Sequence, residues 1–152
     1  MPYLILLALL LCAGCSPQPR ADLVFLNGAE PETIDPALIT GQPEGRVANA
    51  LFEGLLTFDA QGKPQPGMAE SWEISEDGRV YTFRMRENMV WSDGTPLTAR
   101  DFVSSWRRTL DPSTASEYAY QLHYIKNAKA FNEGEITDFA QVGVSAPDDR
   151  TL

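Results

Sequence analysis

The chain has 152 residues, enough for about one domain, and 43% of them are hydrophobic, so it can build a packed core. Asp and Glu outnumber Lys and Arg by 21 to 12, which gives a formal net charge of −9. This balance argues against a nucleic-acid partner, because affinity for phosphates comes largely from basic side chains. It also argues against a polybasic membrane-binding surface.

An apolar segment opens the chain. Residues 3–12 are apolar or aromatic, and small residues and Cys15 follow before a polar, proline-containing stretch. Such a run is too short to span a bilayer, which takes about 20 apolar residues, but it matches the core of a signal peptide. Small residues before a cysteine resemble a bacterial lipobox, in which that cysteine is lipidated and becomes the first mature residue. We therefore expect a lipoprotein signal peptide at residues 1–14 and a lipidated Cys15 with a tether at residues 15–22. The alternative is an ordinary cleaved signal with a chance cysteine.

Cysteine and histidine are scarce in this sequence. The other cysteine, Cys12, lies in the apolar segment, so residues 16–152 contain none, which excludes a disulfide framework and a cysteine-ligated metal site there. The single histidine, His123, would have to be central to any zinc site or Ser-His-Asp triad, and we expect a surface or packed residue instead. We expect no cofactor and no enzyme activity.

Short apolar runs alternate with turns in the part that follows the tether. Residues 23–26 are a continuous apolar run before Asn-Gly, which predicts a buried strand. Asp35 and Pro36 form a turn anchor in the proline-rich loop that follows. Residues 43–57 carry apolar side chains at helical spacing, which predicts a helix. Residues 59–62 predict a turn.

Residues 91–102 read Trp-Ser-Asp-Gly-Thr-Pro-Leu-Thr-Ala-Arg-Asp-Phe. The Asp-Gly pair is a turn signal, because glycine adopts positive φ without steric cost. Thr98 and, three residues later, Asp101 make a capping-box pattern that suits the positive end of the helix dipole. These residues predict a capped helix over 98–110.

Four further elements are expected from turn residues and apolar periodicity. They are a hairpin turn at residues 76–78, a half-buried strand at residues 80–85, partly helical structure at residues 116–133 and a strand at residues 142–144. Residues 150–152 begin an extended segment. Because three residues are too few for a typical strand, we expect a polypeptide that is truncated at Leu152.

Eight motifs, taken in order, carry a family resemblance. They are Asn27-Gly28, Ile34-Asp35-Pro36, Leu51-Phe-Glu-Gly-Leu55, Pro66-Gly-Met-Ala-Glu-Ser-Trp72, the string at 91–102, Ser105-Trp-Arg-Arg108, Leu110-Asp-Pro112 and Thr114-Ala-Ser-Glu-Tyr118. Together they resemble the extracytoplasmic solute-binding proteins of ABC importers, in the dipeptide and oligopeptide family, and most closely its oligopeptide-binding members. The resemblance covers nearly all of residues 23–152.

The resemblance implies a mixed α+β (α/β) fold. Residues 23–152 would be the N-terminal part of a solute-binding domain: the first strand of one lobe of a two-lobed periplasmic-binding-protein fold, plus an accessory subdomain. It implies an oligopeptide ligand, the permease subunits of an ABC transporter as partners, a membrane reached through the lipid anchor, and a periplasmic or cell-surface location. The second lobe, with the charged groups that hold the peptide termini in the family, is absent from this part. We therefore expect this fragment alone not to retain a peptide.

The resemblance also implies ligand contacts. By position, Tyr118 matches a tyrosine that touches the peptide in the oligopeptide subgroup; the alternative is packing within the subdomain. Thr40, Gly41 and Gln42 match an extended segment whose backbone pairs with the peptide; the alternative is an ordinary loop. A close relative within the family has an acidic residue at the position of Thr40, so no charge role is carried over.

Other solutes and another class of function stay open. The same fold could bind a dipeptide, a nickel chelate, haem or an oligosaccharide, and a non-transporting structural or interaction lipoprotein is the alternative class. Trp72, Trp91 and Trp106 are expected to pack the subdomain core rather than to form sugar platforms. Arg107 and Arg108 are expected on the solvated face and cationic last turn of their helix.

Overall fold

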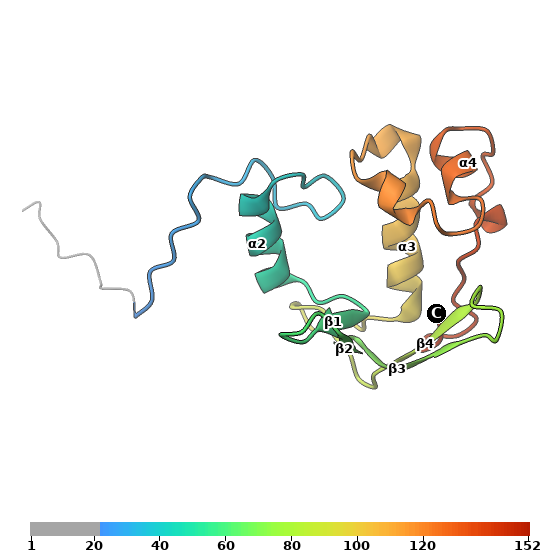
Figure 1. Cartoon of the computed structure of the whole chain (residues 1–152), viewed down its shortest axis with the longest axis horizontal. Coiled ribbons are helices and arrows are strands. Elements are labelled where there is room, and N and C mark those ends of the chain that lie inside the picture. The colour runs from blue at the N-terminus through green and yellow to red at the C-terminus, as the bar shows by residue number, and fades with distance from the viewer. Residues whose placement is uncertain (1–21) are drawn as a thin grey trace, which may run out of the picture.

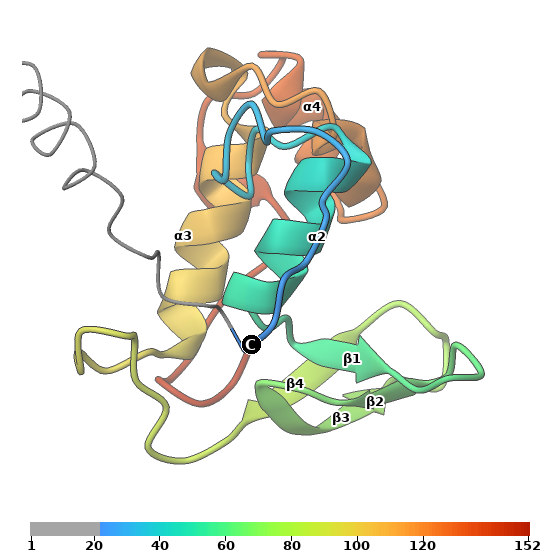
Figure 2. The same ribbon diagram turned by 90° about the vertical axis from the view of Figure 1, so that its left-hand side faces the viewer.

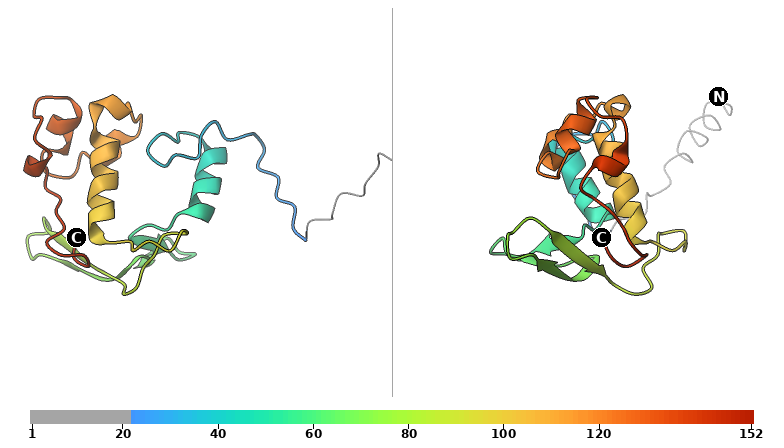
Figure 3. Two further views of the ribbon diagram at one scale, coloured as in Figure 1. Left: turned by 180° about the vertical axis from the view of Figure 1, so that it is seen from behind. Right: turned by 90° about the vertical axis from the view of Figure 1, so that its right-hand side faces the viewer.

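The structure, a computed structural model, describes residues 22–152, and its helices rise from two antiparallel hairpins (Figure 1). Seen from behind, the hairpins form a floor beneath the helices (Figure 3). The mixture of helices and strands confirms the expected fold class. The helices are α2 (Gln42–Leu51), α3 (Ala99–Leu110) and α4 (Ala128–Asn132), and the strands are β1 (Leu56–Phe58), β2 (Pro64–Pro66), β3 (Ala69–Ile74) and β4 (Tyr81–Met85).

Each hairpin turns on a glycine at positive φ. In the β1–β2 turn the Gly62 N–H donates to the Asp59 carbonyl at 3.0 Å, and the φ of Gly62 is +76°. In the β3–β4 turn the Gly78 N–H donates to the Ser75 carbonyl at 2.8 Å, and the φ of Gly78 is +70°. Glycine adopts this geometry without the strain a side chain would add. Both predicted turns and the half-buried strand after the second one are confirmed.

Helix α2 is shorter than the helix predicted over residues 43–57, because it ends at Leu51. The reason is a backbone crossing just beyond it. The Met68 N–H donates to the Gly54 carbonyl at 2.9 Å, and a Cβ on Gly67 would lie 2.6 Å from that carbonyl oxygen. Phe52 is already extended, with φ −123° and ψ 141°, and residues 56–58 pair with β2, so the backbone after Leu51 serves the hairpin instead of continuing the helix.

Helix α3 begins as residues 91–102 predict. The Thr98 N–H donates to Asp101 Oδ2 at 2.7 Å, and Thr98 Oγ1 lies 3.0 Å from the same oxygen. The Asp101 carboxylate therefore accepts from the residue that precedes the helix and lies near the positive end of the dipole. Ala99 and Leu110, at the two ends of α3, are both fully buried.

Two apolar clusters hold the described chain together, one toward each end of α3. The first contains Met85 and Ala99, and Trp106 packs against it as expected. The second contains Leu110 and Phe131 and joins the end of α3 to α4. Figure 2 shows α3 running from the level of the hairpins up to the level of α4.

The end of the chain pairs with β4. The Phe83 N–H donates to the Leu152 carbonyl at 2.9 Å, and the Leu152 N–H donates back to the Phe83 carbonyl at 3.1 Å. The Arg150 guanidinium donates to the carboxylates of Glu87 at 2.6 Å and Glu70 at 3.0 Å. The extended segment expected at the end of the chain is therefore formed, with β4 as its partner.

Two predicted strands are not formed. Residues 23–26 lie outside any strand, and Leu23 and Leu26 are 84% and 87% exposed. A strand needs a partner for its backbone groups, and no segment within residues 22–152 pairs with this run. Residues 142–144 also form no strand, because the Gly143 N–H donates to the Lys126 carbonyl at 2.8 Å while Val142 fills the second cluster.

Three other expectations concern single elements. Trp72 is half-buried. Trp91 is 42% exposed, so the prediction that it packs in the core is wrong. Trp91 begins a surface turn, in which the Gly94 N–H donates to the Trp91 carbonyl. Partly helical structure at residues 116–133 is confirmed by the 3₁₀ turn Ala119–Leu122 and by α4.

The expected signal peptide at residues 1–14 and the lipidated Cys15 lie outside the described residues, and the tether lies outside them up to residue 21. Within residues 22–152, no helix has both the length and the apolar character needed to cross a bilayer.

Candidate functional site

The structure brings together the two groups of residues that the sequence assigned to a ligand site. Thr40 and Gly41 lie in the loop before α2, and Tyr118 directly precedes the 3₁₀ turn Ala119–Leu122. The Tyr118 hydroxyl donates to the Thr40 carbonyl at 3.1 Å, across 78 positions of sequence. Tyr118 is 40% exposed and belongs to neither buried cluster. Its ring therefore lies at the surface, beside the loop.

The backbone of this loop is extended where it meets Tyr118. Gly41 has φ −100° and ψ 165°, and α2 begins at Gln42. The N–H groups of Thr40 and Gln42 have no acceptor within residues 22–152. In an extended chain, alternate residues direct their N–H groups to the same side. The segment thus carries two unpaired donors flanking Gly41, next to the Tyr118 hydroxyl.

A buried carboxylate fixes this segment from the helix side. Glu44, in the first turn of α2, is only 6% exposed, and its Oε1 accepts from the Glu32 N–H at 3.0 Å. That bond lowers the pKa of Glu44 below its usual value, with the N–H groups of Glu44 itself and of Gly41 acting in the same direction against desolvation. The other oxygen, Oε2, is buried and has no hydrogen-bond partner among residues 22–152. A Cβ on Gly41 would collide with it, so Gly41 and Glu44 interlock.

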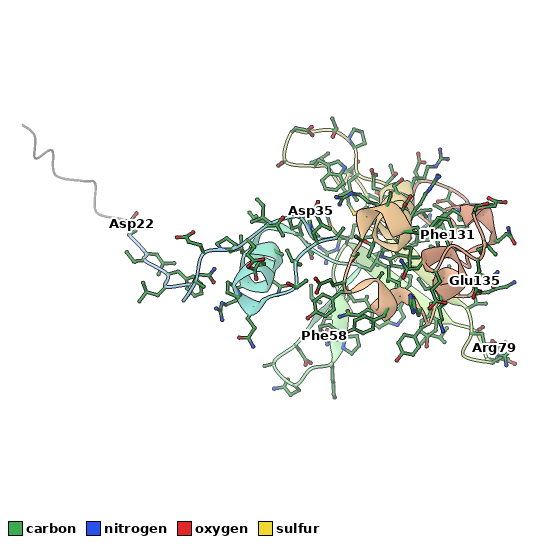
Figure 4. All side chains as sticks on the ribbon, turned by 90° about the horizontal axis from the view of Figure 1, so that it is seen from above. Asp22, Asp35, Phe58, Arg79, Phe131 and Glu135 are labelled. Carbon is green, nitrogen blue, oxygen red and sulfur yellow. The ribbon has the colours of Figure 1, made fainter. Side chains whose placement is uncertain are left out.

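An ion pair ties the same loop to α3. Arg108 donates to both carboxylate oxygens of Asp35, at 2.7 and 2.5 Å, and Figure 4 shows Asp35 between α2 and α3. The side-chain hydrogen bond from Arg108 is the main cause that lowers the pKa of Asp35, helped by the Ala37 N–H and opposed by desolvation. Asp35 anchors a turn as expected, because its carbonyl accepts from the N–H groups of Leu38 and Ile39.

Sequence reasoning missed two members of this arrangement. Arg108 lies in the last turn of α3 with its side chain 52% exposed, as expected, but it also pairs with Asp35, 73 positions away, and no local pattern signals a contact at that separation. Glu44 has a readable signal: it follows Pro43 in the first turn of α2, where acidic residues favour the helix dipole. The burial of its carboxylate is a tertiary effect.

The groups at this loop can hold a ligand. Within residues 22–152 no three His, Cys, Asp or Glu side chains are grouped to hold a metal. His123 is half-buried, and its Nε2 lies 3.1 Å from Asn132 Oδ1, so its described polar contact is to an amide and not to a nucleophile. What the loop does offer is backbone donors, a hydroxyl and an exposed aromatic ring.

Comparison with known proteins identifies the family. A model of "Bacterial extracellular solute-binding proteins, family 5 Middle" matches residues 63–152. The periplasmic oligopeptide-binding protein OppA of Escherichia coli is 48% identical over 144 residues, covering 92% of this chain and 26% of the relative. The dipeptide-binding protein DppE of Bacillus subtilis is 38% identical over 126 residues, covering 83% of this chain and 23% of the relative.

A solved structure is also similar. The Haemophilus influenzae OppA complex with the peptide RPPGFSPFR superposes with a TM-score of 0.78 at 49% identity, covering 82% of this chain and 25% of that one. The chain thus spans about a quarter of the length of the proteins it matches. It belongs to the bacterial extracellular solute-binding proteins of family 5.

Proposed function

We propose that this protein binds peptides outside the cytoplasm and delivers them to the permease subunits of an ABC importer. Thr40, Gly41, Gln42 and Tyr118 form one side of the binding site. The observation that carries this proposal is the hydrogen bond from the Tyr118 hydroxyl to the Thr40 carbonyl, which sets an exposed ring beside an extended segment with unpaired donors. The protein acts by binding and release, with no chemical step.

The chemistry of this edge suits a peptide main chain. Strand addition uses backbone hydrogen bonds, which every peptide offers whatever its side chains. The N–H groups of Thr40 and Gln42 would donate to carbonyls of the peptide, and the Tyr118 ring would cover its backbone. The names of the relatives, which specify oligopeptide and dipeptide binding, and the peptide in the Haemophilus influenzae structure support the same class of ligand.

The test is a calorimetric titration of the full-length protein with alanine peptides of two to five residues. We expect saturable binding. Tyr118→Phe removes one hydrogen bond and should weaken binding about two- to tenfold, and Tyr118→Ala should weaken it further because the ring is lost as well. Tyr81→Ala is the matched control, since Tyr81 is 53% exposed at the start of β4, and it should bind like the unchanged protein. Failure of every peptide to bind would refute the proposal, and unchanged affinity in both Tyr118 variants would remove Tyr118 from the site.

A dipeptide ligand is the second candidate, because a dipeptide-binding protein is 38% identical to this chain. The same titration separates the two. Tightest binding of dialanine, with affinity falling as residues are added, would favour the dipeptide, whereas tighter binding of three to five residues favours the oligopeptide.

We also propose that the protein is exported and held at a membrane through lipidated Cys15. Small residues before this cysteine, at the end of the apolar segment, support this proposal. Mass spectrometry of the mature N-terminus should find Cys15 carrying lipid. Cys15→Ser should abolish the modification, while Cys12→Ser, the control inside the apolar segment, should leave it intact. An unmodified mature N-terminus would contradict the anchor.

A further inference from the structure

The segment that carries Tyr118 presents more aromatic surface than one ring. Tyr118, Tyr120 and Tyr124 are 40%, 56% and 98% exposed. The rings of Tyr118 and Tyr120 touch, with centroids 5.8 Å apart and planes tilted by 42°. The tyrosine surface therefore continues from the Thr40 contact along the segment.

The backbone beneath this tyrosine surface is packed and hydrogen-bonded. Ala119 is 2% exposed, and Leu122 and Ile125 pack against the second buried cluster. The Gln121 N–H donates to the Tyr118 carbonyl at 3.0 Å, and the His123 N–H donates to the Tyr120 carbonyl at 3.1 Å. These turns and the packing of Ala119, Leu122 and Ile125 hold the backbone that carries the three tyrosines.

Beyond Tyr120 the surface is hollowed. Tyr120, Gln121, His123 and Tyr124 line an open depression of about 600 Å³. None of these four is an Asp, Glu, Lys or Arg, so the walls offer no opposite charge to an acidic or basic group. Asn132 Nδ2 donates to the Leu110 carbonyl at 3.0 Å, which leaves its Oδ1 to accept from His123 Nε2.

We infer that Tyr120, Gln121, His123 and Tyr124 form a side-chain subsite for an uncharged aromatic residue of the bound peptide. The inference rests on the proposed peptide-binding function and adds a preference to it. Aromatic rings associate best edge-on or offset, which tilted and exposed tyrosines allow. A lining without Asp, Glu, Lys or Arg favours an aromatic side chain over a charged one, and the contact between Tyr120 and Tyr118 places the subsite next to the backbone-binding edge.

The experiment measures side-chain preference separately from binding itself. The full-length protein is titrated with trialanine and with tripeptides in which one alanine at a time is replaced by Phe, Lys or Glu. At one of the three positions, Phe should bind about three- to tenfold tighter than Ala, and Lys and Glu should not. Tyr120→Ala should reduce this preference to less than twofold while trialanine still binds. Tyr120→Phe, the matched control, keeps the ring and should keep the preference.

The outcomes distinguish the two proposals. If trialanine and the other peptides bind but Phe is never preferred, or if Tyr120→Ala leaves its preference intact, the subsite is refuted and the peptide-binding function stands. Preference for Lys that Tyr120→Ala removes would also overturn the assignment, because the rings would then serve a cation. Absence of binding by every peptide would refute the function and the subsite together.

Discussion

The N-terminal region, residues 22–55, and the body, residues 56–152, are built by different forces. The body contains both apolar clusters apart from Leu55, with Met85 and Leu110 fully buried. In the N-terminal region the buried residues are Ala37, Ala48 and the charged Glu44, while long apolar side chains stay exposed. Its described ties to the helices of the body are polar: Asp35 to Arg108, and Thr40 to Tyr118.

This difference separates scaffold from binding edge. Burial of apolar surface supplies most of the stability of a fold, so the body is the stable part of the described chain. Exposed polar contacts contribute little energy but fix geometry. The ligand-facing loop therefore owes its position to directional hydrogen bonds, and its disruption should affect binding more than folding. Three predictions on stability test the contrast between the two regions.

The largest effect should come from the second cluster. Leu110→Ala removes a fully buried side chain and should lower the free energy of unfolding by about 2–5 kcal/mol. Leu23→Ala, at an 84% exposed position, should change it by less than about 0.5 kcal/mol. Urea unfolding followed by tryptophan fluorescence measures both. Equal losses would mean that residues 23–26 are buried as firmly as the body, and the contrast between the two regions would fail.

A smaller effect is expected at the loop. Gly41→Ala places a methyl group against the Glu44 carboxylate and should cost about 1 kcal/mol through overpacking. The φ of −100° suits alanine, so the collision and not the backbone is the cause. Glu44→Ala removes the colliding group, so adding Gly41→Ala to it should cost nothing more. Unfolding free energies of the two single variants and the double variant decide this. Strictly additive losses would show that the two residues do not interlock.

The smallest effect should be that of the Asp35–Arg108 pair, and it should depend on pH. The pKa of Asp35 is lowered from 3.8 in the folded protein by the Arg108 hydrogen bond. The ionised carboxylate therefore stabilises the folded state at all pH values above the unfolded pKa, and this contribution is lost as pH falls through the lowered folded pKa. Asp35→Asn should lower the melting temperature slightly at pH 7, and the difference from the unchanged protein should vanish in strong acid.

Two variants control this measurement. Arg108→Gln should reproduce the loss at pH 7, and the double variant should be no worse than either single one. A difference that persists unchanged below the lowered pKa would show that Asp35 acts by packing or turn geometry rather than as an ion.

The sequence by itself determined the elements that depend on neighbours within a few residues. The turns at Gly62 and Gly78 require a residue tolerant of positive φ, and the start of α3 requires the acceptor that Asp101 provides. The family followed from motifs along the chain, whose order needs no knowledge of the fold. That resemblance predicts Tyr118 and Thr40 as ligand residues, but it does not predict the hydrogen bond between them.

Where local signals compete with distant partners, only the tertiary structure decided which conformation forms. Helix α2 stops before the crossing at Gly54, residues 23–26 find no strand to pair with, and Gly143 bonds to Lys126 instead of extending a strand. The Asp35–Arg108 and Thr40–Tyr118 contacts join positions 73 and 78 residues apart. The physical reason is common to all of these: a residue's own preferences act within about one turn, but pairing and burial depend on which distant backbone the fold brings beside it.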